Sequence, residues 1–343
     1  MLRKPNILGL LPEEIESLVT KRGLPRYRAD QIFQWVHKHG ARSFDEMTNL
    51  PADLRASLPD DLAIFFPENM TTSRAGEDQS QKLLYRMEDG TSIESVRIAQ
   101  ADGITACVSS QAGCRYDCKF CATARGGFKR SLRAGEIVGQ ILAMETKPKR
   151  IVYMGMGEPL ANYRNVVKSI RVLTHPDGFG IAPKRITVST VGLVPLIKRL
   201  SGEYLGVRLA ISLTSADDDM RSQLMPINEK FPLAELLQAA RDYAQANGDR
   251  VTFEYPLLKG FNDSDRDAAL LIKRLAPIRC QINLIPFNPV EGTPYEAPAE
   301  ARVSAFARAL SRELTVTVRR SAGREIDAAC GQLQIRYQNE KRK

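Results

Sequence analysis

Three cysteines stand close together in the stretch CRYDCKFC, where Cys114, Cys118 and Cys121 have a C-x3-C-x2-C spacing. With Cys107 just upstream, four of the six cysteines of the chain fall within fifteen residues. A structural zinc site needs four ligands, and the nearby sequence offers no histidine. Three thiolates suit a [4Fe–4S] cluster that leaves one iron open to a substrate molecule. A zinc knuckle or an electron-carrying cluster is the alternative, although an electron carrier would normally supply four cysteines.

Length and composition limit the classes of protein to consider. The 343 residues allow one large domain with an appendage or two ordinary domains, and 43% apolar residues predict a substantial core. There is no apolar run of about 20 residues, the length that spans a bilayer, and the N-terminal segment does not resemble a signal peptide. We therefore expect a cytoplasmic protein with no membrane association. Clustered thiols in that compartment indicate metal or redox chemistry rather than structural disulfides.

Positive charge gathers around the cysteine motif and near the C-terminus. The net charge is +9, with nine basic against three acidic residues in 111–150 and seven against three in 319–343. Such a field favours an anionic partner, RNA first, although it can also serve ordinary solubility. The stretch ARGGFKRSLR supplies candidate phosphate contacts in Arg125, Lys129, Arg130 and Arg133. The alternative for each of these residues is a solvated helix N-terminus.

The first hundred residues predict two small units. Residues 1–75 are expected to be an all-helical domain, because stretches such as LPEEIESLVTKRG combine Pro12 and early acids with late bases and a terminal glycine. The polar stretch NMTTSRAGEDQSQ resembles a linker. Residues 76–103 then form a β-hairpin extension, since two β-rich runs, KLLYRM and TSIESVRI, flank a Glu-Asp-Gly turn.

Strands and helices alternate over residues 104–343, which we predict to be the catalytic core. Helical patterns such as 233–248, with Gly248 as a stop, separate the apolar runs. Six β-then-α units with short apolar strands favour a parallel sheet covered by helices. The predicted fold class is therefore α/β, a partial (βα)6 TIM-like barrel. Its strand candidates are 105–110, 150–155, 185–190, 207–214, 250–258 and 281–287, with 315–320 after the last helix.

Unusual polar groups follow these strands, and chemistry in βα folds gathers at the carboxyl ends of strands. The three-cysteine loop follows the first strand and GMGEP, residues 155–159, follows the second. We expect these groups to meet at one rim. The others are Ser189 and Thr190 on the third strand, Ser212 and Thr214 on the fourth, Asn288 after 281–287, and Cys330 past the last strand.

The cysteine loop with Phe120 before its third cysteine, followed by GMGEP, resembles the radical S-adenosylmethionine (SAM) superfamily. The resemblance implies that the methionine part of SAM chelates the open iron and that Glu158 pairs with its ammonium group. CVSSQAGC, MGMGEPLAN, RSQLMPIN, INLIPFNP and DAACGQL together resemble the RlmN family of RNA methyltransferases, which act on adenosine C2. The resemblance covers most of the chain, and in that family the N-terminal helical domain assists RNA binding.

The resemblance also gives roles to Cys330, Cys107 and Glu94. It implies that Cys330 takes a methyl group from one SAM and that a second SAM provides the radical that activates this S-methyl group for addition to adenosine C2. The addition would crosslink the protein to the RNA, and Cys107 would release this crosslink by forming a disulfide with Cys330. Glu94 matches the proton acceptor; strand alternation puts it on the face of Val96 and Ile98, where a carboxylate is costly unless it serves a purpose. A strand-edge salt bridge is the alternative for Glu94, and a buried apolar role is the alternative for the cysteines. We accept that apolar role for Cys280.

Seven residues are expected, from the resemblance, to bind SAM. The family usually shows Ser-Leu-His at the fourth strand, where this chain has Ser-Leu-Thr, so a contact through an imidazole is not possible there. The histidines His37, His39 and His175 are expected at the surface. The expected SAM ligands are Gly157, Glu158, Ser189, Ser212, Leu213, Thr214 and Asn288.

The resemblance implies 23S rRNA, in the peptidyl-transferase region, and tRNA, next to the anticodon, as substrates. It also implies an external one-electron reductant of the flavodoxin type, and a monomer is the default expectation. The closest rival is a Cfr-type C8 methyltransferase, which shares the cysteines. A non-catalytic RNA-binding iron–sulfur protein is the rival from another class, and it would not need Cys107 and Cys330.

Overall fold

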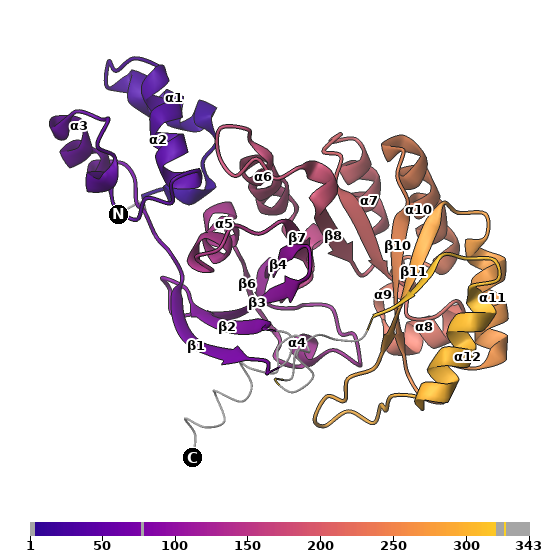
Figure 1. Ribbon diagram of the computed structural model, residues 1–343. Coiled ribbons are helices and arrows are strands. Elements are labelled where there is room, and N and C mark those ends of the chain that lie inside the picture. Colours follow the sequence, from indigo (N-terminus) through magenta and orange to yellow (C-terminus); the bar gives the residue numbers. More distant parts are fainter. Residues whose placement is uncertain (1–3, 77–78, 320–325, 327–343) are drawn as a thin grey trace.

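A computed structural model describes residues 4–76, 79–319 and 326. Residues 7–60 form short helices at one end of the molecule (Figure 1). Pro12 begins α1 (Pro12–Lys21) and Gly23, at φ 72°, follows its end, as predicted. The other helices are η1 (Ile7–Gly9), α2 (Tyr27–His37), η2 (Phe44–Glu46), α3 (Ala52–Ser57) and η3 (Leu58–Asp60).

The stretch predicted to be a linker is instead a strand. Strand β1 (Glu68–Arg74) pairs antiparallel with β2 (Gln81–Arg86), so sheet structure begins before residue 75. Its side chains are polar because the strand lies at the edge of the sheet and none of them is fully buried. The β-branched pair Thr71 and Thr72 was the available signal for a strand.

The predicted hairpin is present. Strand β2 pairs antiparallel with β3 (Ser92–Gln100), and Gly90 takes φ 81° in the turn between them. Strand β3 then pairs antiparallel with β4 (Gly103–Cys107). The hairpin is therefore not a separate module, because it continues directly into the first strand of the core.

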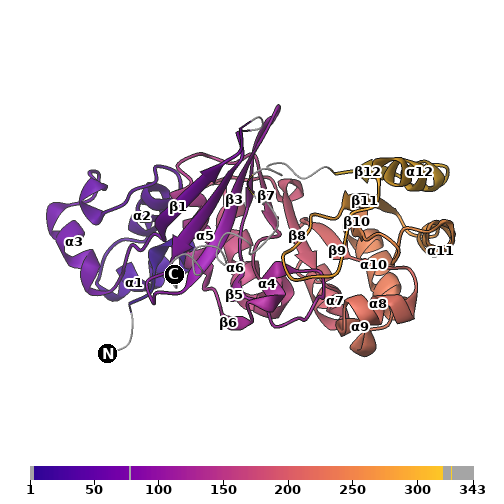
Figure 2. The same ribbon diagram turned by 90° about the horizontal axis from the view of Figure 1, so that it is seen from below.

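The core has the predicted parallel strands. They follow one another in the order β4, β7, β8, β9, β10, β11, β12, and each neighbouring pair is parallel. With β1–β3 they make one ten-stranded sheet that curves through the molecule (Figures 1 and 2). The α/β fold class is confirmed. The strands are β7 (Arg150–Tyr153), β8 (Ile186–Thr190), β9 (Arg208–Ser212), β10 (Val251–Leu257), β11 (Cys280–Pro286) and β12 (Val316–Val318).

Helices connect these strands. Gly248 ends α10 in a left-handed conformation, and Ser264 and Asp267 form a capping box at the start of α11. Helix α7 packs against α10, and α11 against α12. These helices are α5 (Ala134–Ala143), α6 (Tyr163–Thr174), α7 (Val194–Ser201), α8 (Asp218–Leu224), α9 (Ile227–Lys230), α10 (Leu233–Asn247), α11 (Asp265–Leu275) and α12 (Glu300–Leu310), with η4 (Pro159–Asn162) and η5 (Pro183–Arg185).

The N-terminal helices pack closely against the core. A Cβ atom on Gly135 of α5 would lie 3.0 Å from the backbone nitrogen of Gly9 in η1, so only glycine permits this approach. Ile7 and Leu8 belong to the same buried cluster as Ile137 of α5. One continuous apolar core therefore joins the two parts of the chain.

Candidate active site

The cysteine loop projects from a small sheet of its own. Strand β5 (Gln111–Gly113) pairs with β6 (Phe128–Ser131), and the short helix α4 (Ala122–Arg125) lies between them. Cys114 N–H donates to Gly127 O at 3.0 Å, and Cys121 N–H donates to Cys118 O at 3.0 Å. The sequence did not predict this two-stranded base, which fixes both ends of the loop.

The three thiols interact with one another. Burial raises the pKa of Cys114 to about 11 and raises the pKa of Cys118 well above its usual value. The charge of Cys121 acts on both thiols and raises these pKa values further. The thiols favour their neutral form without a metal, so binding of a metal group here would release protons.

The number of thiols bears on the kind of metal group that the loop could hold. A structural zinc site needs four ligands, whereas three thiolates can hold a [4Fe–4S] cluster and leave one iron open. As a donor set, Cys114, Cys118 and Cys121 therefore fit such a cluster.

The glycine-rich loop after β7 lies against the segment after β4. A Cβ on Gly155 would come within 2.7 Å of Ser109 Oγ, and Gly157, at φ 94°, leaves no room for a side chain beside Gln111. Met156 N–H donates to Ser109 Oγ at 2.7 Å, and Glu158 N–H donates to Gln111 Oε1 at 2.9 Å. The glycines therefore bring the second strand's loop to the base of the cysteine loop, as predicted, while Ser109 and Gln111 were missed.

Glu158 connects two strand ends. Its carboxylate accepts from Leu160 N–H at 3.0 Å and from Val191 N–H, just after β8, at 2.8 Å. Burial raises the pKa of Glu158 to about 7, although these backbone donors act in the opposite direction. The Thr190 side chain is a third hydrogen-bond partner. A carboxylate has about four lone-pair positions, so about one remains for a further donor such as an ammonium group.

Glu94 and Cys107 face the same side of the sheet. Val96 on β3 is paired with Cys107 on β4, and Glu94, two residues before Val96, has the same orientation. Glu94 is 4% exposed and Cys107 7% exposed, so both side chains are buried. Ser109 Oγ donates to Glu94 O at 2.5 Å, which fixes the backbone that carries the carboxylate. The prediction that Glu94 lies on a buried face is confirmed.

Positive charge reaches the Cys107 thiol from two directions. Burial raises the pKa of Cys107 to about 11, whereas the Met154 backbone and the charges of Arg319 and Lys82 lower it. Lys82 is 1% exposed and is paired with Val96 across β2 and β3, on the face that carries Cys107. A lysine in an alternating strand was a signal for this residue that our sequence analysis did not use.

A polar row continues on β9, β10 and β11. Ser212 is paired with Glu254, and Glu254 with Asn283, so the three side chains share one face. Asn283 Nδ2 donates to Glu254 Oε1 at 3.0 Å, and Arg319 lies 3.8 Å from the same oxygen. Ser189 is paired with Ala210, two residues before Ser212, and therefore faces the same side. The sequence predicted the two serines but not Glu254 or Asn283.

Thr214 and Asn288 follow the ends of β9 and β11. Thr214 has φ 63°, and its buried hydroxyl donates to Met225 Sδ at 3.0 Å while its carbonyl accepts from Asn262. The hydroxyl and the carbonyl of Thr214 are therefore both engaged within the protein. Leu213 N–H is already bonded to Glu254 O at 3.0 Å, and Asn288 is half-buried.

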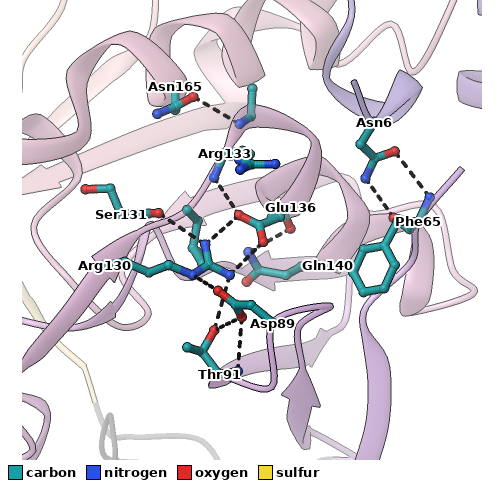
Figure 3. A network of polar contacts seen from close by, with 12 residues as sticks. Asn6, Phe65, Asp89, Thr91, Arg130, Ser131, Arg133, Glu136, Gln140 and Asn165 are labelled. Atoms are coloured by element: carbon teal, nitrogen blue, oxygen red, sulfur yellow. Dashed lines mark hydrogen bonds and ion pairs between the residues drawn. The ribbon is translucent and has the colours of Figure 1, made fainter. Parts of the chain in front are cut away.

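Two of the four candidate phosphate contacts are engaged within the protein. Arg130 is bound to Glu136, Asp89 and Thr91 (Figure 3), and Arg125 donates to Glu291 O. The structure gives these two arginines structural roles, because acidic and carbonyl acceptors far away in the sequence fold onto them. Lys129 and Arg133 are exposed and remain candidates.

One histidine prediction was wrong. His37 is 3% exposed, with its ring 4.4 Å from that of Phe33, because it lies on the apolar face of α2. His39 is exposed and His175 half-buried. Cys280 is half-buried at the start of β11, with Sγ 3.8 Å from Leu275 O, which suits the small apolar role. Cys330 lies outside the described residues.

Comparison with known proteins agrees with this geometry. Residues 108–272 match the radical SAM superfamily, and residues 5–64 match the ribosomal RNA large subunit methyltransferase N-terminal domain. The dual-specificity RNA methyltransferase RlmN of Syntrophus aciditrophicus is 44% identical over 99% of both chains. The chain belongs to the RlmN family.

Further relatives support the same assignment. RlmN of Geobacter sulfurreducens is 44% identical over 96% of this chain and 91% of its own. A crystal structure of a radical SAM methyltransferase from Sphaerobacter thermophilus has a TM-score of 0.91 at 41% identity, covering 96% of this chain and 98% of that one. The prediction of a SAM-dependent radical RNA methyltransferase is confirmed. Among the described residues, no helix has the length and apolar character to cross a bilayer.

Proposed function

We propose that this protein converts adenosine to 2-methyladenosine in the peptidyl-transferase region of 23S rRNA and next to the anticodon of tRNA. The observation that carries the proposal is the shared buried face of Glu94 and Cys107, beside the segment that leads to the cysteine loop. An electron-transfer or sensor protein would need neither a buried base nor a separate thiol there. We further expect a cytoplasmic monomer supplied with electrons by a flavodoxin-type donor.

Cys114, Cys118 and Cys121 would hold a [4Fe–4S] cluster, and two SAM molecules would be used in each turnover. When bound, the cluster and SAM supply the radical that activates an otherwise unreactive C–H bond. Gly157 permits the close approach of its loop to Gln111, and we expect its backbone to contact SAM as well. The remaining contacts to SAM would come from Glu158, Ser189, Ser212, Leu213, Thr214 and Asn288.

Cys330 would carry the methyl group that is transferred, as an S-methyl thioether. Glu94 would accept the proton that leaves adenosine C2. Its position suits a base because the side chain is buried and its backbone is held by Ser109. The sulfur of Cys330 then remains joined to the RNA through the transferred carbon, and a second thiol is needed for release.

Cys107 would supply that thiol. Its thiolate attacks the Cys330 sulfur, so that a Cys107–Cys330 disulfide forms while the bond between the Cys330 sulfur and the transferred carbon breaks. The carbon keeps the bonding electron pair and takes up a proton to become the methyl group of the base, and an external dithiol must then reduce the disulfide. The neighbouring charges of Lys82 and Arg319 favour the thiolate that must attack. Burial keeps the thiol neutral until then, which protects it from oxidation.

An anaerobic assay tests the proposal. Reconstituted protein, SAM, reductant and a 23S rRNA fragment are incubated, and the digested RNA is read by mass spectrometry. We expect 2-methyladenosine; 8-methyladenosine would assign the Cfr-type reaction instead, and no methylated base despite SAM cleavage would contradict the substrate.

Variants of three cysteines test the separate roles. Cys330→Ala should form no product, Cys107→Ala should accumulate a covalent protein–RNA adduct, and Cys280→Ala should behave as the unchanged protein. A Cys330→Ala variant that still methylates RNA would overturn the mechanism. An RNA-binding sensor would retain its RNA affinity in all three variants and show no methylation in any.

A further inference from the structure

The stretch RSQLMPIN, residues 221–228, begins with a fully buried arginine. Arg221 is 1% exposed and is among the largest fully buried side chains of the described chain. It lies in α8, which follows β9 on the rim that carries the cysteine loop. A buried guanidinium is costly unless every donor is paired, so its partners indicate what it holds.

Arg221 joins the ends of two strands. Its Nη2 donates to Val191 O, just after β8, at 2.8 Å and to Ser212 O, the last residue of β9, at 3.2 Å. Its Nε donates to Leu213 O at 3.0 Å. The two strand ends that Arg221 joins are those from which Ser189 and Ser212 are expected to contact SAM.

The direct partners of Arg221 carry no charge. The fourth is Asn228, whose Oδ1 accepts from Nη1 at 2.8 Å. The nearest acid, Asp218, accepts instead from Asn228, Leu233 and Arg274. Burial lowers the pKa of Arg221 to about 10, so the side chain is still charged at neutral pH. The segment therefore carries a positive charge that no directly bound carboxylate neutralises.

The same segment also holds the cysteine loop. Leu224 O accepts from Lys119 N–H, between Cys118 and Cys121, at 3.0 Å. Met225 is fully buried and packs in one apolar cluster with Cys118. Met225 N–H donates to Arg221 O at 2.7 Å, so the arginine and the residues that touch the loop are one turn of chain apart.

Arg221 lies one helical turn from Met225, which packs with Cys118, the most buried cysteine of the loop. Reduction of a cluster adds one negative charge to a group that its thiolates have already made negative. A nearby positive charge in a poorly hydrated site stabilises the more negative, reduced state more strongly. The charge therefore favours acceptance of an electron from a one-electron donor.

We propose that Arg221 is a positioning residue that clamps the ends of β8 and β9 and whose charge raises the reduction potential of the cluster held at Cys118. This inference rests on the proposed cluster at Cys114, Cys118 and Cys121. It does not depend on which RNA base is methylated or on the chemistry of Cys107 and Cys330.

Two substitutions separate charge from clamping. Arg221→Gln removes the charge, whereas Arg221→Lys keeps it but presents donors from one point, which cannot span both strand ends. Full-length protein with a reconstituted cluster is titrated with dithionite, the reduced cluster is followed by electron paramagnetic resonance, and SAM affinity is measured by equilibrium dialysis. As a control, Arg241→Gln removes one charge at an exposed position of α10.

At a fixed solution potential, we expect the ratio of reduced to oxidised cluster to fall about tenfold in Arg221→Gln, which is about 59 mV for one electron. Arg221→Lys should keep the ratio but bind SAM more weakly. An unchanged ratio in folded Arg221→Gln overturns the charge effect, and unchanged SAM affinity in Arg221→Lys overturns the clamp.

If circular dichroism shows that Arg221→Gln does not fold, the exchange of Asn228→Asp together with Asp218→Asn decides the charge effect, because it keeps an amide–carboxylate contact between the two positions. This change places a carboxylate at position 228, where the side-chain oxygen accepts from Nη1 of Arg221, and so neutralises the guanidinium without removing it. The ratio of reduced to oxidised cluster is then expected to fall as in Arg221→Gln. An unchanged ratio overturns the charge effect. Normal cluster signals and SAM binding without RNA methylation would contradict the proposed function alone. If the protein without substitutions holds no cluster after reconstitution, both this inference and the proposed function are contradicted.

Discussion

Arg130 binds Glu136 through two parallel hydrogen bonds, from Nη1 to Oε2 at 2.8 Å and from Nη2 to Oε1 at 2.7 Å (Figure 3). Its Nε pairs with Asp89 in the turn of the β2–β3 hairpin. One guanidinium therefore joins that hairpin turn to the first turn of α5.

Replacing Arg130 should destabilise the protein. Glu136 is 7% exposed, so Arg130→Gln would leave a buried carboxylate without its cation and should cost about 2–4 kcal/mol of unfolding free energy. Arg130→Lys should recover only part of this, because lysine cannot bind both oxygens in parallel. Denaturant titration measures both variants. The exposed Arg133→Gln is the control, and an Arg130→Gln midpoint equal to that control would contradict the structural role.

Lys129 and Arg133 should contribute to RNA binding without reading sequence. Each alanine substitution should reduce the slope of log binding constant against log salt by about 0.7–0.9, as loss of one phosphate contact does. Filter binding at several salt concentrations measures the slope. Arg241→Ala on α10 and Lys273→Ala on α11, each made singly, remove the same one charge elsewhere, and an equal effect in these controls would show that only net charge matters.

The contribution of Glu158 to the stability of the metal-free protein should fall as pH rises from about 4.5 to 7. Its pKa is raised to about 7 in the folded state, so the protonated form is favoured by folding. The contribution is present below the unfolded pKa and lost as pH rises through the folded value, a change of roughly 3 kcal/mol. The difference in unfolding free energy between the protein and Glu158→Gln should change by this amount across the window. A difference that stays constant with pH would show that Glu158 is ionised throughout.

His37 should change the dependence of stability on pH in the opposite direction. Burial, with the nearby His175, lowers the pKa of His37 to about 3, so folding favours the neutral ring. The contribution of His37 to the unfolding free energy is fully present above the unfolded pKa of 6.5 and should fall by about 2 kcal/mol between pH 6.5 and 5. His37→Phe should remove this fall, while His39→Phe, at an exposed site, should keep it. Equal curves for both variants would contradict the assignment.

The contact between Gly9 and Gly135 should not tolerate a methyl group. Gly135→Ala should cost about 1–3 kcal/mol, the usual range for overpacking, because backbone atoms on the other side cannot move aside easily. Gly126→Ala is a matched control in a helix cap with an ordinary contact of 3.5 Å. Thermal unfolding compares the two, and equal midpoints would mean that η1 can shift away from α5.

Periodicity and strand-end rules predicted much of this architecture because they depend on neighbours in sequence. The parallel strands follow from the alternation of strand and helix patterns along the chain. The hairpin follows from its turn residues, and the inward face of Glu94 follows from the alternation of side chains along a strand. Arg130 and His37 were misjudged because their partners, Asp89 and Phe179 among them, lie far away in the sequence. The polar row of Glu254 and Asn283 depends on the register between β10 and β11, which no single segment encodes.

The pairing of β3 with β4 has a further consequence for how this family can change over time. Glu94 and Cys107 are spaced by a ladder of peptide hydrogen bonds, not by the shapes of the side chains around them. Neighbours such as Val96 and Ile98 can therefore be exchanged without altering that spacing. An inserted or deleted residue within the paired part of β3 or β4 would instead turn one of the two side chains to the opposite face. Sequence drift should thus be tolerated in these two strands, whereas the length of their paired parts should not vary.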